Sequence, residues 1–464
     1  MPPPCDVGCA GASLDGIPPR TTTPLAAVVG AAAEAWARSG GPPRWERMGA
    51  MSVRSLLPDL GTPATGTPEA AVPPFARAVL WAHGDDAWRG EGGWTVLLDG
   101  TDRLRRLSAL WQAAVAGRPD PRAPLRGWIS STFSDDSPEP AVLRIPADLR
   151  RATPSGVRDV AQHVDANALA AAVAADRGAR LLADGAVALP AGVADRAWDD
   201  AGYAAGVREL LTRMADSGGE LAKVVISRTM TVPADDADLW RAIGELRREY
   251  PQTWVFAVGG LLGATPEVLA TRHAGLVGSR VLAGSMPRGA DEEEDAALRE
   301  RLASDPRLAE EHRWAARSVL DALAPVVDLA DDDPAPTVLT LPNVHHLATS
   351  VRGRLRDGRG TVLDVVAALH PTAAVGGTPT PDAVRVIAEV EPVDRGRYAG
   401  PVGWLDQDGD GEIALALRCG QQVPGGVRLQ AGGGMVPGAV PEEEVTEIRA
   451  KFLPMRRALG VAED

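Results

Sequence analysis

From residue 200 onward, short apolar runs predict β-strands, and these runs do not alternate regularly with helices. Strands are predicted at 223–228, 254–258, 398–405, 412–419 and 427–431. Gly259-Gly260 after the second run predicts a hairpin. Helices are predicted at 201–215, 236–248, 361–369 and 380–390, and at 291–325 with an interruption near Pro306. Because this order is not a βαβ repeat, we predict an α+β fold with antiparallel sheets.

The first 200 residues are less clearly patterned. Strand-like pieces at 94–98 and 141–145 alternate with Ala-rich helices, one of them at about 160–176. Residues 1–24 are rich in Pro and Thr and are predicted to form a disordered or loosely attached tail. Because no linker divides the chain after residue 75, we predict one large domain, with 25–200 as its N-terminal half and 201–464 as its catalytic half.

Charge and cysteine content exclude several classes of protein. The net charge of −14 argues against a nucleic-acid partner, which requires a basic face. Cys5, Cys9 and Cys419 cannot form a disulfide framework, so a cytoplasmic protein is expected. No run of 18 apolar residues predicts a membrane span, and the first 25 residues do not have the pattern of a signal peptide.

Acidic side chains gather on the helix that is predicted to follow Pro441. Glu444, Glu447 and Lys451 have the spacing of one helix face, directly after a glycine-dense strand end. Two carboxylates beside such a backbone suit a divalent cation that carries an anionic ligand. Carboxylates in a first turn also complement the helix dipole, so the residues alone leave a solvated helix start as an alternative.

Two residues at the ends of predicted strands are candidate acid–base groups. Lys223 heads an apolar strand, where desolvation would lower the pKa of its amine and allow it to act as a general base. Glu267 follows Thr265-Pro266, where a raised pKa would suit a general acid. A lysine that reaches water from a strand end and a glutamate at a helix start are the structural alternatives.

Other polar groups have two interpretations each. Arg418, among aliphatic residues of a predicted strand, requires either a ligand carboxylate or an internal acceptor. One carboxylate of the pair Glu310 and Glu311 is either a magnesium ligand, together with Glu447, or a solvated helix charge. The segment 406–412 resembles the start of a calcium loop, but Leu417 stands where the twelfth-position Glu belongs. We therefore predict a hairpin tip there.

Many short segments of the chain, in the order in which they occur, resemble those of the chorismate-utilising enzymes, most closely the isochorismate synthases of siderophore and menaquinone pathways. The resemblance covers roughly residues 200 to 460. The matching segments are Lys223-Val-Val-Ile-Ser-Arg228, Gly263-Ala-Thr-Pro-Glu267, Leu282-Ala-Gly-Ser-Met-Pro-Arg-Gly289, Glu311-His312, His346-Leu-Ala-Thr349, His370-Pro-Thr-Ala-Ala-Val-Gly-Gly377, Arg395-Gly-Arg-Tyr-Ala-Gly-Pro-Val-Gly-Trp404, Ala416-Leu-Arg418, Ala431-Gly-Gly-Gly-Met-Val436 and 444–451.

The resemblance implies two stacked antiparallel sheets surrounded by helices, the fold of anthranilate synthase component I, with the active site between the sheets. It also implies a Mg²⁺ ion that binds the ring carboxylate of chorismate. Glu311 and Glu447 hold this ion, and Glu444 lies close by through water. The residues implied to bind the substrate are Arg418, Tyr398, the backbone amides from Gly432 through Gly433 to Gly434, Ser285, His346 and Lys451.

The resemblance further suggests a mechanism. Neutral Lys223 takes a proton from a water that attacks C2 of the ring, and protonated Glu267 gives its proton to the departing C4 hydroxyl. Enzymes of this family that use ammonia typically carry Gln in place of Lys223, so no glutaminase subunit is expected, and the family suggests a monomer. The segment His370-Pro371-Thr372 favours isochorismate as the product.

Alternatives and departures remain. A salicylate synthase, which continues to pyruvate loss, and a catalytically silent binding protein on the same fold are the alternative functions. Ala373, Gly433 and Ser350 differ from residues that are frequent in the family, and these changes can alter the shape of the pocket without removing a predicted catalytic group.

Overall fold

The computed structural model describes residues 75–118, 120–183, 197–340 and 344–461, and for Glu311 and Val344 it describes only the backbone. In this structure the predicted hairpin around Gly259-Gly260 is confirmed. Strands β10 (Trp254–Val258) and β11 (Leu261–Thr265) pair with Val258 opposite Leu261. Both turn glycines have positive φ, 58° and 80°, which a two-residue turn of this kind requires. All ten residues of the two strands are buried, so both faces of this hairpin are covered.

Sheet A contains this hairpin. It has ten strands in the order β17-β9-β21-β20-β11-β10-β1-β2-β6-β7, and neighbours are antiparallel. Its other strands are β1 (Val79–His83), β2 (Asp86–Glu91), β6 (Asp148–Thr153), β7 (Gly156–Ala161), β9 (Lys223–Pro233), β17 (Gly377–Thr378), β20 (Cys419–Val423) and β21 (Gly426–Met435).

Sheet B has eleven strands in the order β14-β16-β13-β12-β19-β18-β4-β5-β3-β8, with β15 also paired to β16, and it is likewise antiparallel. Its strands are β3 (Trp94–Leu98), β4 (Arg126–Ser130), β5 (Ala141–Ile145), β8 (Ala179–Leu182), β12 (Val268–His273), β13 (Leu276–Pro287), β14 (Val327–Leu329), β15 (Thr337–Thr340), β16 (Val344–Leu355), β18 (Pro401–Asp406) and β19 (Gly411–Leu415).

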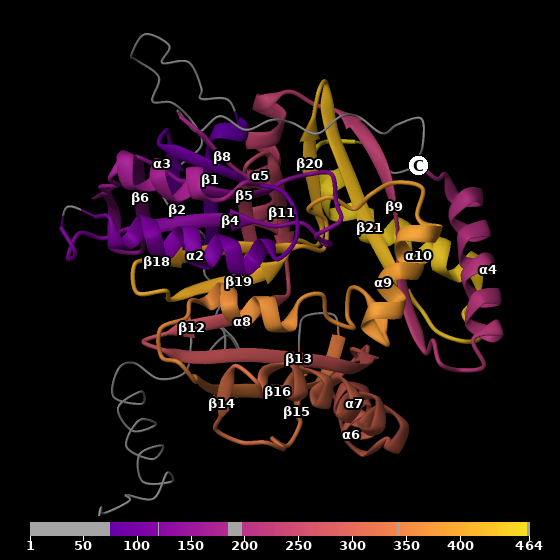
Figure 1. Cartoon of the computed structure of the whole chain (residues 1–464). Helices are drawn as coiled ribbons and strands as arrows, with labels where there is room; N and C mark the ends of the chain where they lie inside the picture. Colours follow the sequence, from indigo (N-terminus) through magenta and orange to yellow (C-terminus); the bar gives the residue numbers. More distant parts are fainter. Residues whose placement is uncertain (1–74, 119, 184–196, 341–343, 462–464) are drawn as a thin grey trace, which may run out of the picture. The chain divides into compact units, whose positions relative to one another are not determined.

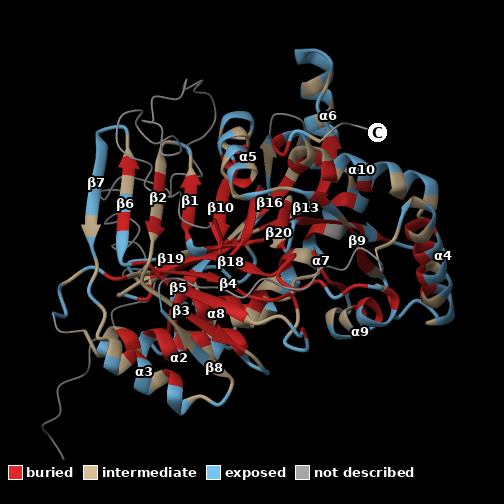
Figure 2. Ribbon diagram, turned by 90° about the horizontal axis from the view of Figure 1, so that it is seen from above, coloured by how far each residue is buried: buried red, intermediate tan, exposed pale blue. Residues whose placement is uncertain are grey.

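Side chains join the two sheets face to face. The indole nitrogen of Trp81 on β1 donates to Glu412 on β19 at 2.8 Å, and the rings of Trp88 on β2 and Trp128 on β4 lie 6.4 Å apart. Arg126 of sheet B stacks on the ring of Trp88 at 4.0 Å. Buried residues concentrate in the central strands, whereas β7 at the edge is largely exposed (Figure 2). The predicted stacked antiparallel sheets are therefore confirmed.

Helices flank the sheets (Figure 1). They are α2 (Arg103–Ala116), α3 (Ala166–Ala175), α4 (Asp200–Asp216), α5 (Asp236–Glu249), α6 (Glu292–Ser304), α7 (Pro306–Leu323), α8 (Val362–Leu369), α9 (Thr380–Val390) and α10 (Pro441–Ala458), with a short 3₁₀ helix η2 at Phe75–Arg77. Helices α6 and α7 lie beside β13 and β16, and α10 packs against β21 and α4. None of the described helices is long and apolar enough to span a membrane.

The structure corrects three predicted elements. The helix expected at about 160–176 begins only at Ala166, because 156–161 forms strand β7. The strand expected at 398–405 begins at Pro401. The strand expected at 412–419 is two strands, β19 and β20, that belong to different sheets. The chain leaves one sheet for the other between them, which apolar composition alone does not reveal.

The described residues belong to one compact unit that spans 55–464. Strand β1 pairs with β10 and β4 pairs with β18, so segments from both sides of residue 200 share each sheet. The predicted tail at 1–24, together with Cys5 and Cys9, lies outside the described residues.

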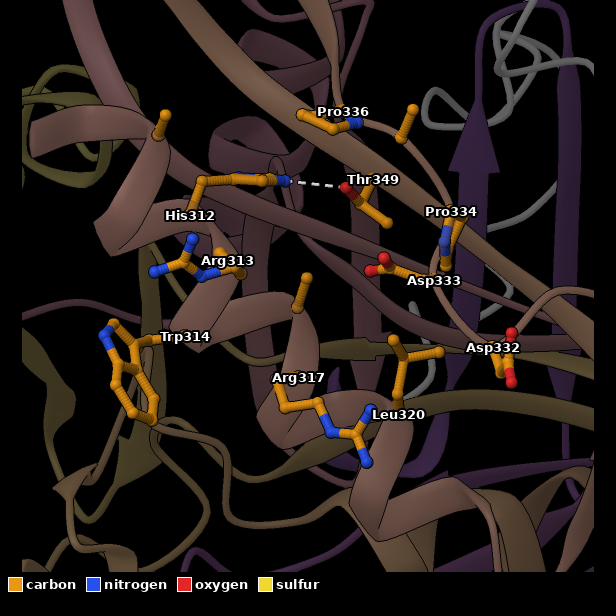
Figure 3. Close-up of a pocket in the computed structure, with 13 residues that line it drawn as sticks. His312, Arg313, Trp314, Arg317, Leu320, Asp332, Asp333, Pro334, Pro336 and Thr349 are labelled. Atoms are coloured by element: carbon orange, nitrogen blue, oxygen red, sulfur yellow. Dashed lines mark hydrogen bonds between the residues drawn. The ribbon is translucent and has the colours of Figure 1, made fainter. Parts of the chain in front are cut away.

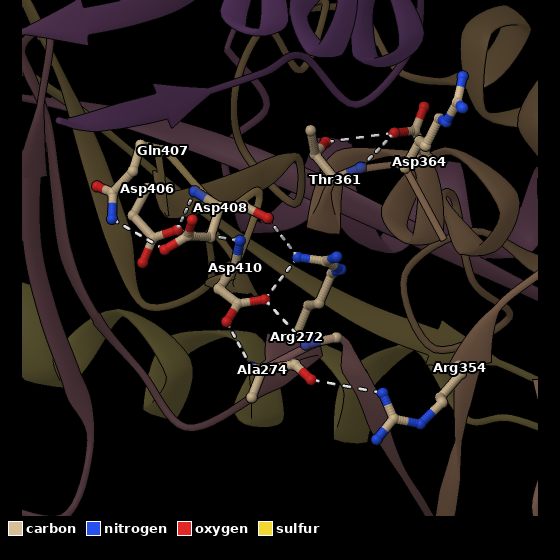
Figure 4. A network of polar contacts seen from close by, with 12 residues as sticks. Arg272, Ala274, Arg354, Thr361, Asp364, Asp406, Gln407, Asp408 and Asp410 are labelled. Carbon is tan, nitrogen blue, oxygen red and sulfur yellow. Dashed lines mark hydrogen bonds and ion pairs between the residues drawn. The ribbon is translucent and has the colours of Figure 1, made fainter. Parts of the chain in front are cut away.

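The hairpin tip at 406–410 is confirmed (Figure 4). The Asp406 carboxylate accepts from the backbone amides of Asp408 and Asp410 at 3.0 and 3.1 Å. Arg272 donates to the Asp410 carboxylate at 2.5 Å. These carboxylates stabilise the turn and its contact with β12. Their role is therefore that of turn residues and not that of a calcium loop.

Candidate active site

Strand ends from both sheets meet where the chain twice crosses from one sheet to the other. The segment after β11 carries Glu267 into β12, and the segment after β19 carries Arg418 into β20. The crossings hydrogen-bond to each other, from the Leu415 amide to the Glu267 carbonyl at 3.0 Å and from the Ala264 amide to the Arg418 carbonyl at 3.2 Å. Residues that are far apart in sequence therefore share one junction.

The antiparallel order explains which residues reach the junction. In sheet A, β9 and β20 begin at the end where β21 and β11 finish. Lys223 is the first residue of β9, and its backbone lies between β17 on one side and β21 on the other. In sheet B, β16 and β12 begin where β13 and β19 finish. Alternating strand directions thus bring the predicted groups to one end of each sheet.

Lys223 and Glu267 are close enough for their charges to interact. Burial raises the pKa of the Glu267 carboxyl, and the positive charges of Lys223 and Arg418 oppose this effect without overcoming it. The residue as a whole is only half-buried, although protein atoms surround its carboxyl group. A carboxyl surrounded by protein atoms holds its proton more strongly than a carboxyl in water.

Arg418 differs from its predicted setting. It was expected inside an apolar strand, but it lies at the crossing between β19 and β20 with a φ of 48°. This left-handed conformation is uncommon for a residue other than glycine. At this crossing the guanidinium of Arg418 is close enough to Glu267 for its charge to act on the carboxyl group.

The glycines of β21 make room for polar side chains. A methyl group on Gly432 would lie 2.9 Å from the hydroxyl oxygen of Tyr398, and one on Gly434 would lie 3.0 Å from Cε of Lys223. Tyr398 is buried, and burial raises its pKa well above the ordinary value, so its phenol is neutral. Lys451 on α10 donates to the Gly432 carbonyl at 2.8 Å and holds the helix against this strand.

The other face of the glycine stretch meets the acidic start of α10. A methyl group on Gly433 would lie 3.2 Å from Oε2 of Glu444, so the glycine leaves space for this carboxylate. That oxygen is buried and has no hydrogen-bond partner among the described residues. Burial and the neighbouring charge of Glu447 raise the pKa of Glu444. Glu447 also pairs with Lys451 at 2.5 Å.

These carboxylates have the chemistry of a cation site. A buried carboxylate oxygen without a partner is costly unless a proton or a cation meets it, and two adjacent carboxylates increase that cost. Glu444 and Glu447 therefore fit a hard divalent cation. Among the described side chains no group of three or more His, Cys, Asp or Glu residues is arranged to hold a metal. The predicted third ligand, Glu311, lies on α7, but its side chain is outside the described part of the structure.

Ser285 and His346 form a pair at the same end of sheet B. They lie opposite each other on β13 and β16, and Oγ of Ser285 is 2.7 Å from Nδ1 of His346. Desolvation lowers the pKa of His346, with a smaller contribution from His345. A neutral imidazole paired with a hydroxyl is a hydrogen-bonding surface for a polar ligand.

His312 anchors α7 to these strands. Its ring nitrogens lie 3.1 Å from the Ala283 carbonyl and 2.7 Å from the Thr349 hydroxyl. The carbonyl can only accept, so Nδ1 carries a proton and donates to it. This contact holds the backbone of the adjacent Glu311 close to Ala283 of β13, which precedes Ser285 by two residues.

The sequence patterns single out neither of two further polar groups near the site. The hydroxyl of Tyr203 on α4 would lie 3.0 Å from a methyl group on Gly433, and the charge of Glu444 contributes to raising the pKa of this buried phenol. Arg395 is buried, pairs with Glu391 at 2.5 Å and donates to the Val225 carbonyl at 2.6 Å. The scarcity of tyrosine, three in 464 residues, is a sequence signal that would have singled out Tyr203.

Comparison with known proteins points to one family. The family model described as chorismate binding enzyme matches residues 166–460. The isochorismate synthase DhbC of Bacillus subtilis strain 168 is 38% identical over 272 residues, which cover 56% of this chain and 68% of that protein. A crystal structure of a putative 2,3-dihydroxybenzoate-specific isochorismate synthase, DhbC from Bacillus anthracis, matches with a TM-score of 0.63 and 28% identity, over 83% of this chain and 97% of that one.

A second solved structure, less similar in sequence, has the same fold. Anthranilate synthase component I from Streptococcus pneumoniae TIGR4 matches with a TM-score of 0.60 over 85% of this chain and 95% of that one. Its identity of 18% supports the fold alone. The predicted component I-like architecture is thus confirmed.

Proposed function

The chain belongs to the family of chorismate-binding enzymes, and from that membership we propose that it is an isochorismate synthase, an isomerase that converts chorismate to isochorismate. The observation that carries the proposal is the junction between the two sheets. There the positive charges of Lys223 and Arg418 interact with the carboxyl group of Glu267, whose pKa is raised.

The proposed reaction needs one base and one acid. Burial under the bound substrate disfavours the charged form of Lys223, and the neutral amine then removes a proton from a water above C2 of the ring. The oxygen bonds to C2 as the ring double bonds shift. The C4–O bond breaks, and Glu267 gives its proton to the leaving hydroxyl, which departs as water. One water enters and one leaves, so atoms balance. The protonated amine and the carboxylate then reset by exchanging a proton.

The substrate carries two carboxylates, and we propose a different partner for each. Arg418, Tyr398 and the amides of Gly432 and Gly433 receive the enolpyruvyl carboxylate through charge-assisted hydrogen bonds. Ser285, His346 and Lys451 complete the wall of the pocket. The raised pKa of Glu267 supports this arrangement, because a neutral acid does not repel an incoming dianion.

We propose Mg²⁺ as the cofactor, held by Glu444 and Glu447 with Glu311. The unpaired, buried oxygen of Glu444 supports this proposal. When bound, the ion neutralises and orients the ring carboxylate. Without a cation, Glu444 and Glu447 would repel that carboxylate. We further propose a cytoplasmic enzyme that works as a monomer. We expect no glutaminase subunit, because Lys223 stands where enzymes of the family that use ammonia typically carry Gln.

Chromatography of the products formed from chorismate tests the proposal, with and without EDTA. We expect isochorismate from the native protein. Lys223→Ala should lower turnover by about a thousandfold or more, because proton transfer and its positioning are lost together. Glu267→Gln should lower it similarly, because an amide cannot give up the proton. Circular dichroism checks that both variants are folded.

Three outcomes would contradict the proposal. Release of free pyruvate together with salicylate would assign the runner-up activity, a salicylate synthase. No consumption of chorismate in the presence of Mg²⁺ would support a silent binding protein. A Lys223→Ala variant that keeps most of its turnover would remove the lysine from the mechanism.

A further inference from the structure

A cavity of about 650 Å³ lies between α7 and the segment 332–336 (Figure 3). One wall is α7, which contributes residues from Ala309 to Leu320, and Thr349 of β16 closes the inner side. Successive residues of a strand point to opposite faces, so Thr349 and His346, three residues apart, lie on opposite faces of β16. The cavity therefore lies on the face of β16 opposite to the side chain of His346.

The body of the cavity is apolar and leaves room. Ala309, Ala316 and Leu320 have the spacing of one helix face, and Pro334 and Pro336 lie on the opposite wall. Small side chains along the middle of a helix face fill little of the space beneath the loop. A volume of this size is within the range of small-molecule sites, roughly 300–1,000 Å³.

Opposite charges line the two walls. Arg317 extends from the helix to the side of the loop, whereas the guanidinium of Arg313 points away from the loop (Figure 3). Asp332 and Asp333 line the loop wall, and Asp333 directs its carboxylate toward the helix. Within the described residues the Asp333 carboxylate makes no ion pair. Arg313 pairs with Glu310 at 3.5 Å and Arg317 with Asp321 at 2.8 Å, but these arginine side chains are 70% and 63% exposed. Such exposed pairs are weak and exchange readily for a ligand carboxylate.

We propose that this cavity is a second binding site, separate from the catalytic junction, for a zwitterionic amino acid with an aromatic or branched side chain. The ligand carboxylate meets Arg317, its ammonium meets Asp333, and its side chain rests on Ala316 and Leu320. A simple anion would satisfy only the helix wall and would face Asp332 and Asp333, and a simple amine would face the Arg317 guanidinium. The proposal does not depend on the catalytic one.

Calorimetry on the full chain with three probes tests the charge pattern. The probes are L-phenylalanine, 3-phenylpropionate, which lacks the amine, and 2-phenylethylamine, which lacks the carboxylate. We expect L-phenylalanine to bind with the highest affinity. Each missing charge should weaken binding about tenfold or more, because each removes a charge-assisted contact.

Two variants separate the walls. Arg317→Gln should weaken both L-phenylalanine and 3-phenylpropionate about tenfold. Asp333→Asn should weaken L-phenylalanine by a similar factor and leave 3-phenylpropionate unchanged or tighter. Arg307→Gln and Asp331→Asn are the matched controls, since these exposed residues neighbour the cavity walls on the same helix and loop but do not line the cavity. All four changes are at exposed positions, so each variant should fold.

Three results would overturn the proposal. The first is an absence of heat with L-phenylalanine up to about 10 mM, a range that would detect even millimolar affinity. The second is binding that Arg317→Gln and Asp333→Asn leave unaltered. The third is displacement of L-phenylalanine by chorismate in simple competition, which would place the probe at the catalytic junction.

Discussion

Gly434 shows how closely the backbone of β21 approaches the proposed base. Its missing side chain leaves the space in which the Lys223 stem lies, since a methyl group there would come within 3.0 Å of Cε. Gly432 and Gly433 do the same for Tyr398, Tyr203 and Glu444. The glycine stretch therefore lets these side chains lie close to the backbone of β21.

Gly434→Ala should lower kcat by about ten- to a hundredfold while the protein remains folded. The physical reason is that the added methyl group displaces the Lys223 amine by a few tenths of an ångström or more, and positioning errors of this kind are costly. Turnover of chorismate measures the effect. Gly244→Ala is the control, because a methyl group there meets nothing within 4 Å. Full activity of Gly434→Ala would show that Lys223 has room to move without loss.

At the scale of elements, Arg395 joins several segments around the site. Its guanidinium donates to Val225 on β9 at 2.6 Å and to Val375, in the loop before β17, at 2.8 Å. It also pairs with Glu391 after α9, and both side chains of the pair are 3% exposed. This single arginine thus orders β9 two residues beyond Lys223.

Arg395→Met should lower the free energy of unfolding by about 3–5 kcal/mol, because the Glu391 carboxylate is left buried without its partner. Urea denaturation measures this change. Arg385→Met is the matched control on α9: its side chain is 62% exposed, so losing its pairs with Asp382 and Glu389 should cost less than about 1 kcal/mol. Equal effects of the two substitutions would contradict the assignment of Arg395 as a buried anchor.

At the scale of the whole molecule, the pH dependence of stability should reflect His370. Burial lowers the pKa of this histidine to about 4, below its ordinary value, and its Nε2 lies 3.0 Å from the Phe133 carbonyl. The unfolded chain therefore binds a proton near pH 6.5 that the folded protein does not accept. The stabilisation is complete above about pH 6.5 and is lost as the pH falls toward 4.

His370→Gln should remove this part of the acid sensitivity. Between pH 7 and pH 4.5, the native protein should lose on the order of 2 kcal/mol more stability than the variant. Urea unfolding of both proteins at several pH values measures the difference. Parallel stability profiles would show that His370 takes up a proton in the folded state.

The folded molecule as a whole should also respond to the proposed cation. A ligand that binds only the folded state stabilises it, by about 2.7 kcal/mol at a hundred times its dissociation constant. Thermal unfolding with increasing Mg²⁺ should therefore raise the Tm of the native protein. The rise should be much smaller in Glu444→Gln, which keeps the shape of the side chain and loses its charge. An equal rise in both would place the ion elsewhere.

Local patterns determined much of this protein in advance. Strand and helix types from residue 200 onward followed from apolar periodicity, and the Gly259-Gly260 hairpin and the division of α6 from α7 at Pro306 followed from turn and helix-breaking chemistry. Glu444, Glu447 and Lys451 share a helix face because their spacing requires it. The resemblance supplied the family and the candidate residues, whose catalytic and ligand roles remain predictions.

Only the tertiary structure decided which residues meet. One apolar run became β19 and β20 in two sheets, and Arg418 came to the junction because the chain turns there with a positive φ. Tyr203, Glu391 and the 650 Å³ cavity beside α7 depend on contacts across long stretches of chain. Periodicity reports which face of an element is buried. It does not report which element covers that face, because pairing between distant strands is set by the packing of the whole domain.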